Sequence, residues 1–239
     1  MPIIEAIKLK KVYDEGESET VALSDATFSI NKGEFVAVIG PSGCGKSTLL
    51  HILGFLERHT SGTYKFDGKT IDDYTEDELA KIRNTKMGFV FQAFNLLART
   101  TVLENVKLPL MYSNIAELSW DKRAREAIES VGLSHRLNHE SSQLSGGEKQ
   151  RVAIARALVM QPEVIFADEP TGNLDSKSGR LVMEILQELS EKREHTVVLI
   201  THETYTAEHA ERIIEFKDGE IVHDTKVAHR HNAKQNFNK

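Results

Sequence analysis

The chain has 239 residues, of which 40% are hydrophobic, so it is long and apolar enough to bury a core. Its 30 basic and 36 acidic side chains give a net charge of −6, which excludes a general electrostatic attraction for nucleic acid, and we expect no nucleic-acid partner. The most apolar runs, residues 35–39 and 197–200, are far shorter than the ~20 residues that span a bilayer.

The first residues carry an early acid and lack both a basic leader and a long apolar stretch, so we expect no secretory signal. Cys44 is the single cysteine of the sequence, which excludes an internal disulfide framework. These features are typical of a cytoplasmic protein.

Two runs near the N-terminus predict β-strands. Residues 3–12 and 21–30 are rich in β-branched and aliphatic side chains, and the acidic, glycine-containing stretch 14–20 separates them. The protein therefore begins with a hairpin-like β region.

The next strand is predicted at residues 35–39, which are apolar on both faces, as in a strand buried inside a parallel sheet. Residues 164–167 and 196–200 show the same pattern. Because helical segments alternate with these strands, the sequence predicts an α/β fold with a parallel sheet covered on both faces.

Between residues 94 and 160 the pattern becomes mostly helical. Ser119 is a candidate N-cap for a helix with one apolar face, whose members are Ala124, Ala127, Ile128 and Val131. The stretch from Asp224 to the C-terminus is polar with little apolar periodicity, and we expect it to be disordered.

A glycine-rich loop follows the strand at 35–39. It fits the pattern G-x-x-x-x-G-K-[ST] and runs into a predicted helix, the context that a phosphate-binding loop requires. Its nine residues are Gly40, Pro41, Ser42, Gly43, Cys44, Gly45, Lys46, Ser47 and Thr48. Backbone N–H groups of such a loop wrap a phosphate chain, Lys46 reaches the β- and γ-phosphates, and Ser47 can hold Mg²⁺. A glycine-rich turn without a ligand is much the weaker interpretation here.

Three further side chains follow buried strands. Asp168 and Glu169 end the strand at 164–167, where a P-loop NTPase needs an acid for Mg²⁺ and a second group to orient water. An isolated Asp-Glu pair is usually solvated, but the phosphate loop upstream favours a site. A lone histidine is usually structural, yet His202 follows the strand at 196–200, where open α/β sheets bind ligands, so a γ-phosphate contact is favoured.

Leu144–Glu148 has the sequence Leu-Ser-Gly-Gly-Glu and precedes a helix predicted from Lys149 to about Val159. Exposed N–H groups at a helix start and two adjacent glycines suit an anion. A serine N-cap with a glycine turn explains the same residues equally well.

These elements, in this order, resemble the nucleotide-binding subunit of ABC transporters over nearly the whole chain. The resemblance implies a P-loop NTPase core with an antiparallel β subdomain and a helical subdomain. Residues 1–226 would form one ABC ATPase domain, with residues 1–92 and 161–226 as the α/β core, residues 93–160 as the helical subdomain, and residues 227–239 as a disordered tail. In this family the signature Ser145, Gly146, Gly147 and Glu148 of one subunit covers the ATP held by the other. The resemblance therefore implies an ATP-dependent homodimer with two Mg-ATP.

The resemblance also assigns residues whose roles the pattern alone leaves open. Gln92 resembles the glutamine that contacts Mg²⁺ and the attacking water. Tyr13 resembles the aromatic that stacks on adenine; without the resemblance it would be an edge-strand aromatic. Asp175 lies in the loop that links the two sites across the dimer, and His202 matches the switch histidine.

Residues 91–97, 101–106 and 170–173 are most similar to the macrolide-exporter and lipoprotein-release branch. The resemblance implies an integral-membrane permease partner, with a periplasmic or extracellular accessory protein as a further candidate, and a location on the inner face of the cell membrane. Two alternatives stay open: a regulatory ATPase like the cell-division relative, and a soluble ABC ATPase without a permease. The second usually has two cassettes or a long coiled-coil insert, which this sequence lacks.

Overall fold

The computed structural model describes residues 2–14, 16, 19–193 and 195–234. The strands are β1 (Pro2–Asp14), β2 (Glu19–Asn31), β3 (Phe35–Ile39), β4 (Ser61–Phe66), β5 (Lys69–Thr70), β6 (Met87–Val90), β7 (Val164–Asp168), β8 (Thr196–Thr201), β9 (Arg212–Lys217) and β10 (Glu220–Lys226). The helices are α1 (Lys46–Leu53), α2 (Glu76–Lys86), α3 (Val102–Met111), α4 (Trp120–Ser130), α5 (Gly146–Leu158), α6 (Ser176–Arg193) and α7 (Thr204–Ala207). None of these helices, within the described residues, is both long and apolar enough to cross a membrane.

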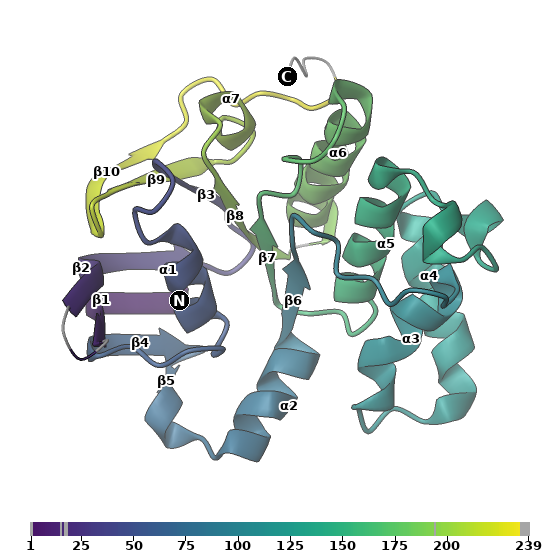
Figure 1. The fold of residues 1–239 in the computed structure, drawn as a ribbon, viewed down its shortest axis with the longest axis horizontal. Helices are drawn as coiled ribbons and strands as arrows, with labels where there is room; N and C mark the ends of the chain where they lie inside the picture. Colours follow the sequence, from purple (N-terminus) through teal and green to yellow (C-terminus); the bar gives the residue numbers. More distant parts are fainter. Residues whose placement is uncertain (1, 15, 17–18, 194, 235–239) are drawn as a thin grey trace.

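The strands form one mixed sheet in the order β5-β4-β1-β2-β10-β9-β3-β8-β7-β6. Strands β9, β3, β8, β7 and β6 run parallel to one another. Strands β5, β4, β1 and β2 are antiparallel to one another, and β10 is antiparallel to β9. A single parallel pair, Glu220 with Asp25, joins β10 to β2. The predicted parallel core and the predicted antiparallel β region are both confirmed (Figure 1).

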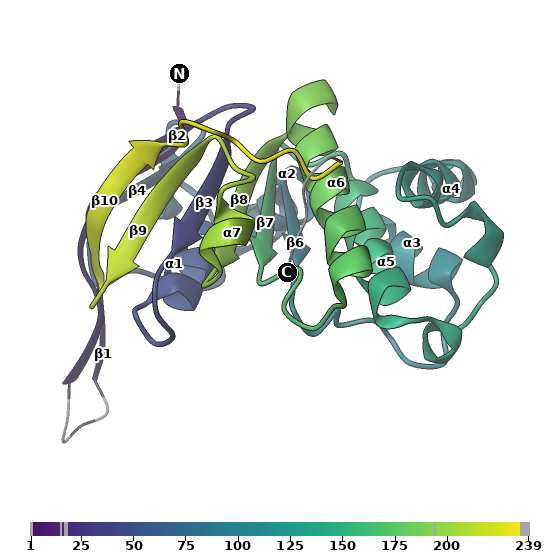
Figure 2. The same ribbon diagram turned by 90° about the horizontal axis from the view of Figure 1, so that it is seen from above.

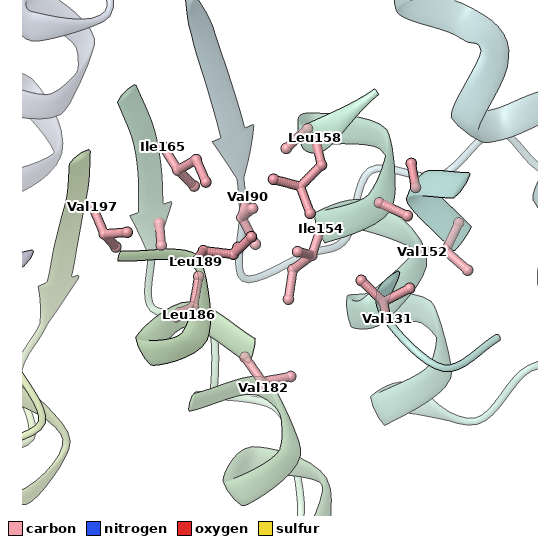
Figure 3. Packing of buried hydrophobic residues seen from close by; sticks show 14 of the residues in the cluster. Val90, Val131, Val152, Ile154, Leu158, Ile165, Val182, Leu186, Leu189 and Val197 are labelled. Carbon is pink, nitrogen blue, oxygen red and sulfur yellow. The ribbon is translucent and has the colours of Figure 1, made fainter. Parts of the chain in front are cut away.

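Alternate residues of the central strands enter two different apolar cores, because successive side chains of a strand point to opposite faces. Val36, Phe166 and Val198 belong to the core that includes Leu49 and Leu50 of α1. The other core contains Phe35, Ile165 and Val197, with side chains from α5 and α6. Figure 3 shows Ile165, Val197 and Val90 facing Leu186 and Leu189 of α6, with Ile154 and Leu158 of α5 beside them. Helices thus cover both faces of the parallel strands (Figure 2).

The middle of the chain is helical as predicted, and α3, α4 and α5 pack together at one end of the molecule (Figure 1). The predicted apolar face of α4 is buried: Ala124, Ala127, Ile128 and the following Val131. Ser119 occupies the N-cap position, but its hydroxyl donates to the Ala116 carbonyl and makes no cap hydrogen bond. α4 therefore starts at the predicted place without the predicted side-chain cap.

The prediction of disorder from Asp224 onward is wrong for residues 224–234, because residues 224–226 belong to β10 and residues 227–234 pack on α6. Ala233 is fully buried, and its N–H donates to Gln187 Oε1 at 2.8 Å. Gln187, on α6, also donates through Nε2 to the carbonyls of His231 and His209. This segment is held by backbone hydrogen bonds to a buried amide, which apolar periodicity does not reveal. Residues 235–239 lie outside the described residues.

Candidate nucleotide-binding site

The phosphate loop joins the end of β3 to the start of α1 and is pressed against neighbouring backbone. A Cβ on Gly40 would lie 2.2 Å from the Phe216 carbonyl oxygen of β9. A Cβ on Gly45, which has φ +101°, would lie 2.1 Å from the Ala22 carbonyl oxygen of β2. Both glycines are therefore required by close backbone approach as well as by conformation.

Lys46 is 8% exposed and points along the inner side of its own loop. Its Nζ donates to the carbonyl oxygens of Gly40 and Pro41, both at 2.8 Å, and lies 3.8 Å from the buried Cys44 Sγ. A Cβ on Gly43, by contrast, would meet no atom within 4 Å. The loop thus has a packed inner side, an open outer side, and a cation at its centre.

Asp168, Glu169 and His202 come together where β7 and β8 end, as their positions after those strands predict. His202 Nδ1 lies 2.7 Å from Glu169 Oε1, and the Thr201 hydroxyl donates to Glu169 Oε2 at 3.3 Å. Glu169 has φ +46° and its N–H donates to the Ile200 carbonyl, which fixes this carboxylate between its two partners. Thr201 was not predicted as a site residue, although its place directly before His202 was a signal in the sequence.

Burial raises the pKa of Asp168, and the neighbouring Glu169 charge raises it further, while His51 and Lys46 act in the opposite direction. Both effects mean that the Asp168 carboxylate is costly to keep ionised in this place. A divalent cation would offset this cost, because an opposite charge stabilises the ionised carboxylate.

Gln92 follows β6 and faces the loop after β7. Its Nε2 donates to Asn173 Oδ1 at 3.4 Å, and Asn173 Nδ2 donates back to the Gln92 carbonyl at 3.2 Å. A Cβ on Gly172 would lie 2.7 Å from Gln92 Nε2, so the glycine makes room for the amide. The structure therefore brings Gln92 to the loop that follows Glu169.

Ser145 caps α5, which begins three residues before the predicted Lys149. The Ser145 hydroxyl accepts from the Glu148 N–H, and a Glu148 oxygen accepts from the Ser145 N–H at 2.9 Å. Arg136 donates to the other Glu148 oxygen at 2.8 Å. The hydrogen bonds to Ser145 and the guanidinium of Arg136 keep the pKa of Glu148 below its ordinary value. Of the two interpretations left open for Leu144–Glu148, this structure contains the helix cap.

The start of α6 packs against the start of α5. A Cβ on Gly147 would lie 2.4 Å from the Ser178 hydroxyl oxygen, and Ser178 donates to Asp175 through both its N–H and its hydroxyl. These hydrogen bonds lower the pKa of Asp175. In the described part of the chain, Ser145–Glu148 and Asp175 make no hydrogen bond to the phosphate loop, so the signature residues form a second cluster.

Tyr13 lies beside the far end of the phosphate loop. Its hydroxyl donates to Glu57 Oε2 at 2.8 Å and is 3.5 Å from Thr48 Oγ1, while Lys11 Nζ is 4.8 Å from the ring centroid. Partial burial raises the pKa of the Tyr13 hydroxyl. Stacking on adenine stays a prediction, and this position is compatible with it.

The residues present fit a magnesium nucleotide. The open side of Gly43 and the exposed Ser47, in the first turn of α1, suit phosphate oxygens. Ser47, Asp168 and Gln92 offer hydroxyl, carboxylate and amide oxygens, the donor types that Mg²⁺ prefers.

A protein-family model described as ABC transporter matches residues 23–172, which include the phosphate loop, Gln92, the signature and both acids. An ABC transporter ATP-binding protein of Methanocaldococcus jannaschii is 50% identical over 220 residues, covering 92% of this chain and 98% of its own. The macrolide export ATP-binding/permease protein MacB of Aggregatibacter actinomycetemcomitans is 48% identical over 225 residues, covering 94% of this chain and 35% of its own. The chain therefore spans about a third of the length of that relative.

Solved structures agree with the family model. A bacterial ABC transporter cassette, solved as a dimer, superposes with a TM-score of 0.86 at 45% identity, covering 95% of this chain and 99% of that one. A dimeric post-hydrolysis ATP-binding cassette with bound ADP and Pi gives the same TM-score at 44% identity, again covering 95% of this chain and 99% of that one. This chain belongs to the ABC transporter family, as an ATP-binding cassette with ATPase function.

Proposed function

We propose that two copies of this chain close around two Mg-ATP, and that each copy supplies a different part of each site. On the phosphate side, Lys46 exchanges its contacts with the Gly40 and Pro41 carbonyls for the β- and γ-phosphates. Ser47, Asp168 and Gln92 would hold Mg²⁺, which would act as a Lewis acid on the phosphate oxygens. Tyr13 stacks on the adenine.

Glu169 is the proposed catalytic carboxylate of hydrolysis. The supporting observation is that hydrogen bonds fix the orientation of its carboxylate. His202 and Thr201 hold its two oxygens, so the group is oriented before water arrives. Glu169 orients water for in-line attack, while His202, which contacts Glu169 and is 55% exposed, also contacts the γ-phosphate.

The second half of each site comes from the signature cluster of the other copy. Ser145 and Gly146 are exposed at the N-terminus of α5, where N–H groups and the helix dipole favour an anion. The cluster makes no hydrogen bond to its own phosphate loop among the described residues, and the similar solved cassettes are dimeric. Asp175, at the start of α6, lies beside this cluster and links the two sites.

An integral-membrane permease is the proposed partner, which would hold the chain on the inner face of the cell membrane. A groove of ≈ 510 Å³ between α2, β6 and α3 is lined mainly by apolar side chains, among them Leu56, Phe91, Pro109, Tyr112 and Met160. Tyr112, which is 81% exposed, adds to the apolar surface at this groove. The MacB relatives are described as ATP-binding/permease proteins. A periplasmic or extracellular accessory protein would bind the permease and not this chain directly.

The first test uses Glu169→Gln, which keeps the size of the side chain and removes its charge. We expect ATP binding to persist and turnover to fall by about 100-fold or more. The variant is used with Mg-ATP to capture partners from membranes of the source cells, with the wild type as control. Retention of a permease by the variant supports the proposal. Rapid hydrolysis by Glu169→Gln contradicts the catalytic assignment, and capture of ribosomes or other soluble partners alone contradicts the permease.

A further inference from the structure

Arg156, on the signature helix α5, holds the segment that follows Gln92. Its two terminal nitrogens donate to consecutive backbone carbonyls, to Asn95 at 2.5 Å and to Phe94 at 2.9 Å. These residues lie about 60 positions earlier in the chain and belong to the loop between β6 and α3. The planar guanidinium thus makes a bidentate hydrogen-bonded contact with the backbone.

The backbone segment bound by Arg156 has an unusual conformation. Phe94 and Asn95 have φ of +59° and +50°, a left-handed pair without glycine. Such a conformation is costly and persists where surrounding contacts fix it. The two hydrogen bonds from Arg156 stabilise this conformation, because they favour the orientation of both carbonyls.

Among the residues that the structure describes, Arg156 has no carboxylate within 4.0 Å, and burial lowers the pKa of its guanidinium. A half-buried arginine normally pairs with an acid. The carbonyls of Phe94 and Asn95 take that place, which makes this loop the main partner of the charge.

The other side of the same loop reaches the nucleotide site. Gln92 exchanges hydrogen bonds with Asn173, and the Phe94 ring lies within 3.9 Å of where a Cβ on Gly146 would be. The loop is thus enclosed by the signature helix on one side and by the segment after Glu169 on the other.

We propose that Arg156 is a positioning residue, which ties the Gln92 loop to the signature helix and so sets the place of the Gln92 amide at the magnesium side of the site. This inference rests on the proposed function, in which Gln92 contacts Mg²⁺. Because Arg156 links the Gln92 loop to α5, the loop and the helix are expected to move together.

The test is Arg156→Lys, which keeps the charge and loses the fork. The matched control is Arg125→Lys, the same change at an exposed arginine of α4. In the nucleotide-free full chain, amide hydrogen exchange over residues 92–97 is expected to be about fivefold faster in Arg156→Lys. The half-saturating Mg²⁺ concentration for ATP hydrolysis is expected to rise by a similar factor, while ATP binding without Mg²⁺ stays unchanged. Arg125→Lys is expected to match the wild type.

A purely structural role for Arg156 would lower the melting temperature and leave the Mg²⁺ dependence as it is, which overturns the positioning role. Unchanged exchange over residues 92–97 overturns the proposal as a whole. Gln92→Ala separates this inference from the proposed function. If that variant has wild-type Mg²⁺ dependence, the magnesium role of Gln92 is wrong, and the exchange rate alone decides whether Arg156 holds the loop.

Discussion

Gly43 and Gly45 lie two residues apart in the phosphate loop, and both have positive φ, but a side chain has different neighbours at each. At Gly45 a Cβ would overlap the Ala22 carbonyl oxygen at 2.1 Å, whereas at Gly43 it would enter open space. We therefore expect Gly45→Ala to lower the free energy of unfolding by roughly 3 kcal/mol, and Gly43→Ala by about 1 kcal/mol, the cost of the backbone conformation alone. Urea unfolding of the nucleotide-free chain measures both values.

Gly43→Ala is the control in this comparison, because it carries the same substitution in the same loop. Equal losses in the two variants would show that backbone conformation accounts for the whole effect. The packing of the loop against β2 would then be looser than the close approach to Ala22 implies.

Single residues were predictable where a short motif carries the chemistry. Lys46, Asp168 and Glu169 were named from the sequence because the phosphate loop and a strand-ending acid pair are local patterns. Arg136 and Arg156 were missed. Arg136 pairs with Glu148, which lies 12 residues away in the sequence. Arg156 binds backbone carbonyls, which every residue has, so the sequence of the contacted loop does not reveal the interaction.

At the scale of helices, Glu148 at the start of α5 is paired with Arg136, which lies in the turn after α4. The contribution of the Glu148 charge to stability can be tested by its dependence on pH. Its folded-state pKa lies below the ordinary value of 4.5, so the ionised form stabilises the folded chain. This contribution is complete above about pH 4.5, and it is lost as the pH falls through the lower folded value.

Glu148→Gln keeps an acceptor for the capping box and removes the charge that faces Arg136. We expect the variant to be about 1 kcal/mol less stable at pH 7, after allowance for solvent screening, and the difference to shrink toward zero as the pH falls well below 4.5. Thermal unfolding from pH 7 to pH 3 gives the profile, with Glu129→Gln on the exposed face of α4 as the control. A difference that does not change with pH would contradict the ionic origin.

The existence of the elements was predictable from periodicity, but their ends depend on hydrogen bonds that several residues share. α5 begins at Gly146 because Ser145 and Glu148 close a capping box there, whereas Ser119 lies before α4 and binds the Ala116 carbonyl instead. The same residue type therefore has two outcomes, decided by the local backbone angles.

At the scale of the whole molecule, the sequence predicted the parallel core, the β region and the helical region, since each depends on many side chains that agree. It did not predict that residues 227–234 pack on α6, because their hydrogen bonds are made with Gln187, Arg180 and the backbone of residues 208–211, which their own sequence does not reveal. The folded unit extends at least to Lys234, beyond the predicted boundary at residue 226.

The proposed dimer can be tested by the mass of the protein in solution. With Mg-ATP, Glu169→Gln should have a mass twice the 26.8 kDa of one chain by light scattering, and it should remain a monomer without nucleotide. Gly146→Asp, added to this variant, places a negative charge on the exposed first residue of α5, where an acid favours the helix but repels a phosphate. We therefore expect the double variant to bind one fluorescent ATP per chain with little change in affinity, and to stay a monomer. Asn114→Asp adds the same charge at an exposed loop position and should leave the dimer intact. A dimer that persists with Gly146→Asp would mean that the signature helix does not face the γ-phosphate of the other copy.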